Sequence, residues 1–220
     1  MKLVLASGSQ RRRELLTMCG YDYEIIVSNA DETIDENDPE SFVRALSFRK
    51  AKDVFDRLFA AGRRDFAVIG SDTVVAFQKE GETKPVIIGK PKDAEDAVRI
   101  LSMLSGKTHR VFTGVSVIAD IPDENAAAQC SIREKAEIQT ECSITEVTFE
   151  TLSPDEITDY VNSGDPLDKA GSYGIQGPFG MFVREIRGNY FTVIGMPIPV
   201  LYKMLKKIGI LPHGFYERIE

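Results

Sequence analysis

The sequence has little or none of several residue types that would point to a particular class of protein. It contains no tryptophan, two histidines and three cysteines among 220 residues, and no two cysteines form a CxxC pair. Histidines and closely spaced cysteines supply most zinc ligands, so the sequence predicts no zinc site. An odd number of widely separated cysteines also argues against a disulfide framework and favours reduced thiols in the cytosol.

Long hydrophobic runs are also missing. No stretch of 18 apolar residues occurs, so we expect no transmembrane helix. The apolar run near the N-terminus is four or five residues long, which is too short for the hydrophobic region of a signal peptide. We therefore expect a cytoplasmic protein without a membrane partner.

Positive charge is in the minority. The chain has 27 Lys and Arg residues against 34 Asp and Glu residues, which gives a formal net charge of −7. Proteins that bind nucleic acid carry a basic face, so the acidic balance argues against a nucleic-acid partner. The apolar fraction of 43% and the charged fraction of 28% are typical of a folded protein with a substantial core.

What the sequence does contain is a strand–loop–helix pattern at its N-terminus. Residues 3–6 are apolar, residues 7–9 are Ser-Gly-Ser, and a helix pattern begins near Gln10. Free backbone N–H groups and the helix dipole suit an anion at such a corner. Three successive arginines at 11–13 occupy the first turn, where the dipole favours acidic residues, and the arginine fork matches phosphate oxygens. The pattern predicts a polyphosphate site; because neither Walker A nor GxGxxG is present, a plain corner with surface arginines is the alternative.

Two further stretches carry acidic residues. Segment 28–39 is acidic and rich in turn residues, so it is either a solvated loop or a source of one carboxylate that holds a divalent metal at the anion site. Segment 66–77 is an apolar strand interrupted by polar residues that include Asp72. Burying an aspartate is costly unless it is paired or metal-bound, and buried aspartates commonly act as bases or metal ligands. The sequence therefore favours a functional role for Asp72.

Helix and strand patterns alternate early, and strand patterns dominate the middle of the chain. The predicted helices cover 40–61, 93–105, 152–162 and 200–208. The predicted strands cover 21–27, 66–77, 111–119 and 136–150, with a hairpin of strands at 181–186 and 191–194. We expect an α/β (α+β) fold in which a mixed twisted sheet with flanking helices forms two lobes around a central cleft.

The domain organisation follows from the absence of any linker or repeat. We expect a single domain over residues 1–220, with a surface insertion at 120–134. The glycine-rich stretch 167–178 is typical of a loop that a ligand approaches closely. The cleft should lie where residues 7–13, Asp72 and the loop around Gly171 meet.

Six groups of short motifs follow one another along residues 1–205. They are Ser7-Gly8-Ser9-Gln10-Arg11-Arg12-Arg13-Glu14-Leu15-Leu16, Gly70-Ser71-Asp72-Thr73-Val74-Val75, Gly89-Lys90-Pro91, Leu104-Ser105-Gly106, Phe112-Thr113-Gly114, and Asp168-Lys169-Ala170-Gly171 with Tyr173-Gly174-Ile175-Gln176-Gly177. In this order they resemble the motifs of the Maf family of nucleoside triphosphate pyrophosphatases. The ordered set is far more specific than any single motif.

The resemblance implies hydrolysis of a nucleoside triphosphate between its α and β phosphates, which gives a monophosphate and pyrophosphate. It implies a divalent metal, Mg²⁺ or Mn²⁺, held by Glu32 and Asp72, with Asp72 also the proton acceptor that activates water. It further implies a homodimer. The residues that would bind the triphosphate are Ser7, Arg11, Arg12, Lys50 and Lys90.

One branch of this family is indicated by the residues that would select the nucleobase. Thr73 and the Ile175-Gln176-Gly177 segment resemble the branch that acts on dTTP and UTP, where Arg11, Thr73 and Gln176 would set specificity. A glutamine amide offers a donor and an acceptor to the O4 and N3–H edge of a pyrimidine. Such an enzyme would clear surplus or modified nucleotides. The alternatives are a 7-methyl-GTP pyrophosphatase of the same family and a septum or cell-division regulator that acts by binding nucleotide or protein.

Overall fold

The computed structural model describes residues 1–79, 81–121 and 136–214. Apart from its first two positions, the insertion predicted at 120–134 lies outside the described residues. The strands are β1 (Lys2–Leu5), β2 (Tyr23–Ile25), β3 (Phe66–Phe77), β4 (Val86–Ile88), β5 (Thr108–Asp120), β6 (Ala136–Phe149) and β7 (Val183–Arg187). The helices are α1 (Gln10–Met18), α2 (Pro39–Ala60), α3 (Ala94–Leu104), α4 (Pro154–Asn162), α5 (Tyr190–Ile194) and α6 (Ile198–Lys207).

The strands form one mixed sheet of seven strands. Their order is β2-β1-β3-β5-β6-β7, with β4 paired to β3. Strand β1 runs parallel to β2 and β3, whereas β3, β5, β6 and β7 are successively antiparallel. The predicted mixed α/β architecture is confirmed. Among the described residues, no helix combines the length and apolar character needed to cross a membrane.

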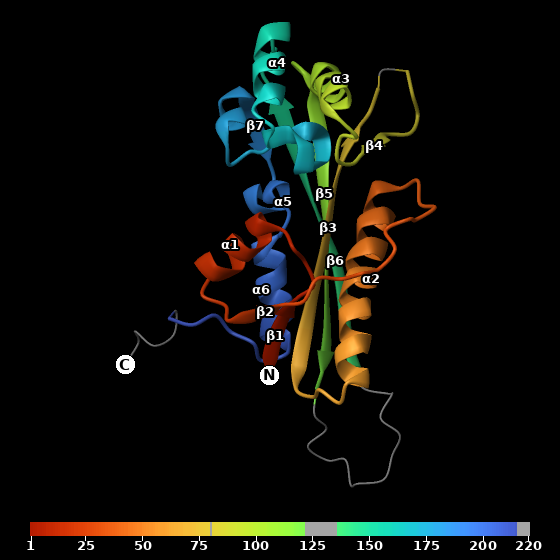
Figure 1. Ribbon diagram of the computed structural model, residues 1–220, viewed down its shortest axis with the longest axis vertical. Coiled ribbons are helices and arrows are strands. Elements are labelled where there is room, and N and C mark those ends of the chain that lie inside the picture. The colour runs from red at the N-terminus through yellow and green to blue at the C-terminus, as the bar shows by residue number, and fades with distance from the viewer. Residues whose placement is uncertain (80, 122–135, 215–220) are drawn as a thin grey trace.

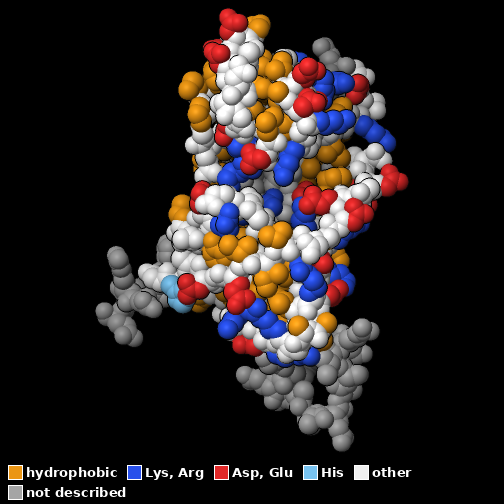
Figure 2. All heavy atoms as spheres, viewed as in Figure 1, with side chains coloured by type: hydrophobic (Ala, Val, Ile, Leu, Met, Phe, Trp, Pro, Cys, Tyr) orange, Lys and Arg blue, Asp and Glu red, His pale blue; other side chains and the backbone are white. Residues whose placement is uncertain are grey.

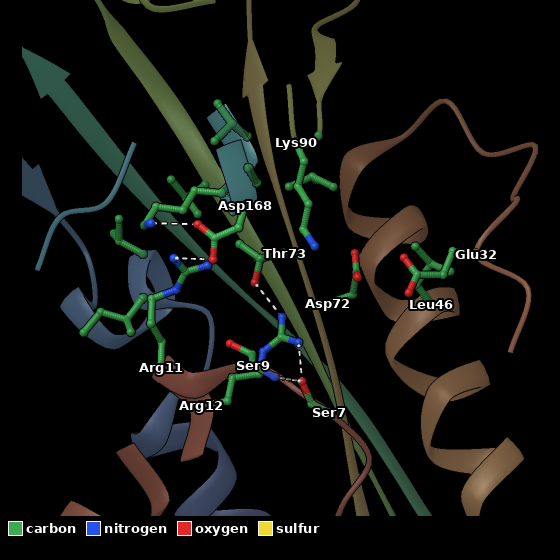
Figure 3. A pocket seen from close by; sticks show the side chains of 18 of the residues that line it. Ser7, Ser9, Arg11, Arg12, Glu32, Leu46, Asp72, Thr73, Lys90 and Asp168 are labelled. Carbon is green, nitrogen blue, oxygen red and sulfur yellow. Dashed lines mark hydrogen bonds and ion pairs between the residues drawn. The ribbon is translucent and has the colours of Figure 1, made fainter. Parts of the chain in front are cut away.

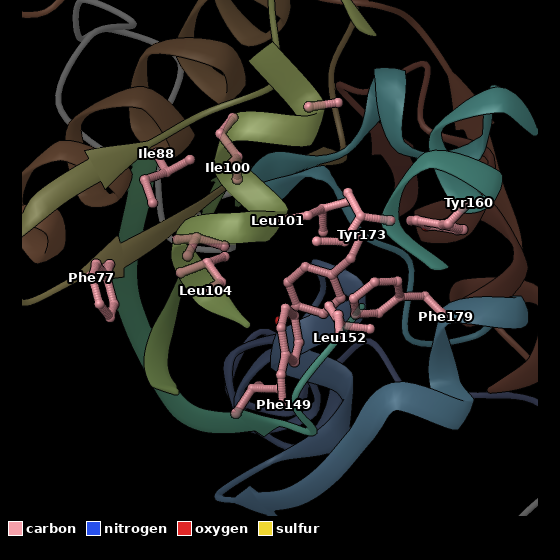
Figure 4. Close-up of a cluster of buried hydrophobic side chains, with 14 of the residues drawn as sticks. Phe77, Ile88, Ile100, Leu101, Leu104, Phe149, Leu152, Tyr160, Tyr173 and Phe179 are labelled. Atoms are coloured by element: carbon pink, nitrogen blue, oxygen red, sulfur yellow. The ribbon is translucent and has the colours of Figure 1, made fainter. Parts of the chain in front are cut away.

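The three long strands β3, β5 and β6 run through both ends of the molecule and join two lobes (Figure 1). Helices α3 and α4 with β4 and β7 form one lobe, and α1 and α6 with β1 and β2 form the other (Figure 1). Helix α2 lies against β3 and β5. Each lobe has its own buried cluster, and the α3–α4 cluster is built around Phe149, Tyr173 and Phe179 (Figure 4).

His109 belongs to the α3–α4 cluster. It is 2% exposed, and its Nε2 shares a hydrogen bond of 3.0 Å with the Tyr173 hydroxyl. Burial lowers the pKa of His109 to about 3, so the imidazole is neutral at neutral pH. This histidine is a structural residue.

Helices α2 and α4 begin at N-cap residues close to the starts that the sequence predicts. Asp38 accepts a hydrogen bond of 2.9 Å from the Ser41 N–H at the start of α2, and Pro39 occupies the first turn. Ser153 and Glu156 form a reciprocal capping box at the start of α4. These local signals place α2 and α4 within two residues of their predicted starts.

The hairpin predicted at 181–186 and 191–194 is wrong. Strand β7 pairs with β6, and Tyr190–Ile194 is the short helix α5. Asn189 caps this helix by accepting a hydrogen bond of 2.9 Å from the Phe191 N–H, and Gly195 ends it with a φ of +109°. Five residues are too few for periodicity to distinguish a buried helix from a strand.

Two glycines allow the backbone of α2 to lie directly on the sheet. A Cβ at Gly70 on β3 would overlap the Ser47 carbonyl oxygen and would lie 2.7 Å from the Ala51 nitrogen. A Cβ at Gly114 on β5 would likewise overlap the Val43 carbonyl oxygen. This close approach brings the side chains of α2 within reach of β3.

Candidate active site

A cavity of about 1150 Å³ opens between the two lobes. On the surface it is a hollow with Lys, Arg, Asp and Glu side chains gathered around it (Figure 2). Its walls come from the β1–α1 corner, α2, β3, the turn after β4 and the loop before η3 (Pro178–Phe182). Every predicted site residue lines it: Ser7, Arg11, Arg12, Glu32, Lys50, Asp72, Thr73, Lys90 and Gln176.

The β1–α1 corner leaves the start of α1 open. Ser9 is the N-cap residue, but its side chain accepts no capping hydrogen bond, and the first turn holds no acidic residue. The Ser9 N–H instead donates to Ser7 Oγ at 3.2 Å. Because the first-turn N–H groups lack a side-chain acceptor, this end of α1 suits an anionic ligand in the cavity.

Arg12 is held by three neutral acceptors, and Figure 3 shows two of them, Ser7 and Thr73. Its Nε donates to the Gly195 carbonyl oxygen at 2.9 Å, and its terminal nitrogens donate to Ser7 Oγ at 3.1 Å and Thr73 Oγ1 at 3.4 Å. Burial lowers the pKa of Arg12, and the nearby Asp72 carboxylate opposes that shift. In the described part of the chain no carboxylate pairs with Arg12, so its charge is available to an anion.

The side chains of Arg11 and Arg13, on either side of Arg12, point in different directions. Arg11 points to Asp168 of the opposite lobe, with 3.8 Å between Arg11 Nη1 and Asp168 Oδ2 (Figure 3). Arg13 turns back to the Gly8 carbonyl oxygen and does not line the cavity. The structure therefore brings together the two arginines that the motif predicts as substrate ligands.

Lys50, Asp72 and Glu32 converge on one wall. Lys50 Nζ lies 2.7 Å from Asp72 Oδ1 and 3.0 Å from Glu32 Oε1. Asp72 is 8% exposed, and the Lys50 side chain is 12% exposed. The ion pair compensates the burial of the aspartate, and the close packing of α2 on β3 makes it possible. Lys50 is therefore part of the site rather than a solvated helix lysine.

Lys90 and Gln176 approach from the other lobe. Lys90 follows β4 and points into the cavity on the side of Asp72 (Figure 3). The Gly171 N–H donates to the Gly89 carbonyl oxygen at 3.0 Å, which holds the Gln176 loop beside Lys90. Gly171 has a φ of +73°, and a Cβ there would lie 2.6 Å from Val75 Cγ2, so the close approach requires glycine.

Tyr160 of α4 supports the loop that carries Gln176. Its hydroxyl donates to Asp165 Oδ2 at 2.5 Å and accepts the Gly174 N–H at 3.1 Å. Lys169 Nζ donates to Asp165 Oδ1 at 3.0 Å and to Asp168 Oδ1 at 2.7 Å. This network links the helical lobe to the residue that faces Arg11.

Sequence reasoning missed the role of Gly195. Its carbonyl oxygen accepts Arg12 Nε at 2.9 Å and Ser71 Oγ at 3.0 Å, so it orients the guanidinium. A backbone acceptor 183 residues away from its donor leaves no residue-type signal in the sequence. Only the packing of α5 against β5 and β6 places it there.

Comparison with known proteins is consistent with this geometry. Residues 2–208 match the family model described as Maf-like protein. The chain is 40% identical to the dTTP/UTP pyrophosphatase of Agathobacter rectalis over 217 residues, which covers 95% of this chain and 98% of that protein. It is 42% identical to the dTTP/UTP pyrophosphatase of Bacillus thuringiensis subsp. konkukian over 210 residues, which covers 95% and 96%.

Among solved structures, the Staphylococcus aureus Ham1 protein aligns with a TM-score of 0.48 and 16% identity, over 94% of this chain and 99% of that chain. The resemblance seen in the motifs is confirmed by the family model and by the 40–42% identity of these relatives. The chain belongs to the Maf-like protein family.

Proposed function

We propose that this chain hydrolyses dTTP and UTP to the nucleoside monophosphate and pyrophosphate, and so removes surplus or modified pyrimidine nucleotides. Relatives at 40% and 42% identity carry the name dTTP/UTP pyrophosphatase. The observation that carries the proposal is the placement of the Lys50–Asp72 pair in the same cavity as the Arg12 guanidinium, whose hydrogen-bond partners among the described residues are neutral oxygens.

The triphosphate binds where positive groups from separate segments face the cavity. Arg11 and Arg12 come from the first turn of α1, and Lys90 comes from the turn after β4. Ser7 Oγ lies beside Arg12 and offers a hydroxyl to a phosphate oxygen. Departure of pyrophosphate builds negative charge, and cations fixed around the leaving group stabilise that charge.

Asp72 is the proton acceptor for the attacking water. Its Oδ1 accepts Lys50, and no hydrogen-bond partner of Oδ2 occurs among the described residues. That oxygen is therefore open to a water molecule that enters with the substrate. A carboxylate within hydrogen-bond reach of water suffices for general base catalysis.

Glu32 and Asp72 are suited to hold Mg²⁺ or Mn²⁺, because both already converge on one cation, Lys50 Nζ. Bound there, the ion would polarise phosphate oxygens and stabilise the leaving pyrophosphate. No group of three or more His, Cys, Asp or Glu able to hold a metal occurs in the part of the chain that the structure describes. Mg²⁺ is commonly coordinated by one or two carboxylates together with phosphate oxygens of the substrate and water molecules. Lys50, released from the carboxylates, would turn to the phosphates.

If the metal ion replaces Lys50 Nζ between Glu32 and Asp72, Lys50→Met should raise the Mn²⁺ affinity of the nucleotide-free protein about tenfold. The substitution removes the positive charge that competes with the ion for the two carboxylates. Electron paramagnetic resonance of free Mn²⁺ measures the affinity without any turnover. Lys52→Met on the same helix is the control, since Lys52 pairs with Asp56 at the surface. Equal affinities in all three proteins would show that Lys50 does not compete with the metal.

The base preference is tested with a panel of nucleotides. We expect pyrophosphate release to be fastest from dTTP and UTP among dTTP, UTP, CTP, 7-methyl-GTP, ITP and the common purine nucleotides. Gln176→Leu should lower kcat/KM for dTTP about 10- to 100-fold, because it leaves the polar edge of the base unpaired. A wild-type preference for 7-methyl-GTP would favour the other branch of the family. No turnover with either metal would favour the regulatory alternative.

The proposal extends to a cytoplasmic homodimer. The described cysteines, Cys19 and Cys142, are free thiols, as expected in a reducing compartment. Dimerisation rests on the resemblance to the family.

A further inference from the structure

A chain of hydroxyl groups leads from the cavity through the sheet to α5. Thr73 on β3 lines the cavity and is the register partner of Thr113 on β5. The two Oγ1 atoms are 3.0 Å apart, and Thr113 Oγ1 lies 2.7 Å from the carbonyl oxygen of Thr192. Thr113 and Thr192 are both 0% exposed, so no bulk water reaches the inner part of this chain.

The direction of each hydrogen bond follows from the chemistry of the atoms. A carbonyl oxygen has no hydrogen, so the 2.7 Å contact requires that Thr113 donate to Thr192. A hydroxyl carries one hydrogen, so the 3.0 Å contact between the two side chains must use the hydrogen of Thr73. Toward the cavity, Thr73 Oγ1 therefore presents only lone pairs. Its neighbour on that side, an Arg12 terminal nitrogen at 3.4 Å, is indeed a donor.

We propose that Thr113 is a positioning residue that makes Thr73 an obligate hydrogen-bond acceptor, and thereby selects thymine and uracil over cytosine. The inference rests on the proposed function, because it assumes that Thr73 faces the base. Thymine and uracil offer an N–H at position 3, whereas cytosine offers a lone pair there. The lone pair of cytosine N3 and the lone pair that Thr73 Oγ1 presents to it would repel each other, and cytosine N3 would have no donor there.

Gln176 alone does not supply this discrimination. Its amide can turn over and exchange donor and acceptor, so it can match the N4 and N3 edge of cytosine as well as the O4 and N3 edge of uracil. The Thr73 hydroxyl, by contrast, cannot be reversed while Thr113 donates to the Thr192 carbonyl oxygen. A fixed polar group rejects the wrong partner more strongly than an adaptable one.

The test is Thr113→Val, which keeps the side-chain shape and removes the hydroxyl. It frees the Thr73 hydrogen, so Thr73 can donate to cytosine N3. We expect the ratio of kcat/KM for dTTP to kcat/KM for dCTP to fall about tenfold. Thr113→Ser, which retains the hydroxyl, should restore the wild-type ratio. Thr113→Ala removes the same hydroxyl and replaces the valine variant if that protein does not fold.

Ser143→Ala is the matched control. Ser143 Oγ bonds Thr192 Oγ1 at 2.7 Å, so this variant removes a hydroxyl contact to the same residue of α5 without touching Thr73. An equal loss for dTTP and dCTP in Thr113→Val, with an unchanged ratio, would overturn the proposal and make Thr113 a structural residue. A wild-type enzyme that hydrolyses both nucleotides equally would overturn the base preference itself, which is a separate result.

Discussion

Asp72→Asn is expected to lower kcat for pyrophosphate release about 10²- to 10⁴-fold, because the amide cannot accept the proton of the attacking water. The substitution preserves the size and shape of the side chain. It also weakens the contact with Lys50 Nζ, which lies 2.7 Å from Asp72 Oδ1. The arginines and Lys90 do not depend on this carboxylate, so nucleotide binding should largely persist.

The measurement is steady-state release of pyrophosphate from dTTP, together with the dissociation constant of a non-hydrolysable analogue. Asp56→Asn on the exposed side of α2 is the matched control, since Asp56 pairs only with Lys52 among the described residues. Wild-type turnover by Asp72→Asn would exclude Asp72 as the base. Lost binding together with lost turnover would indicate that Asp72 acts mainly through the metal.

Gly114→Ala is expected to lower the stability of the protein strongly, because it overpacks the contact between α2 and the sheet. The added methyl group would overlap the Val43 carbonyl oxygen and would lie 3.0 Å from the Arg44 nitrogen, and both atoms belong to the backbone of α2. Backbone atoms cannot rotate away, so the helix must shift as a unit. Overpacking of this kind costs about 3 kcal/mol or more. For a chain of this size the melting temperature should fall by roughly 6–12 °C.

Thermal unfolding followed by circular dichroism measures this change. Gly70→Ala should behave in the same way, because its methyl group would meet the Ser47 carbonyl oxygen. Gly89→Ala is the control for stability, since nothing lies within 4 Å of the added Cβ and Gly89 has no positive φ. An unchanged melting temperature in Gly114→Ala would contradict the direct packing of α2 on the sheet. The Gly114→Ala protein that still folds should also lose activity, because a displaced α2 separates Lys50 from Asp72.

Long patterned segments with clear end signals were predictable from the sequence. The strand at 66–77 has the predicted bounds, and α2 spans Pro39–Ala60 against a predicted 40–61. The strand is marked by a long apolar run, and the helix is marked by hydrophobic periodicity over many residues together with an aspartate cap and a proline. The short segment at 190–194 lacked such length, and its cap at Asn189 decided in favour of a helix.

The candidate site divides in a similar way. The sequence by itself singled out Arg11, Arg12 and Asp72, which the structure places in one cavity, because arginines in a helix start and an aspartate in a buried strand conflict with local preference. Only the tertiary structure decided how they meet: Lys50 between Asp72 and Glu32, Arg12 on the Gly195 carbonyl oxygen, and Thr113 behind Thr73. These contacts join residues from 18 to 183 positions apart. Local sequence patterns encode propensity and burial, whereas such pairings depend on how whole helices and strands pack in space.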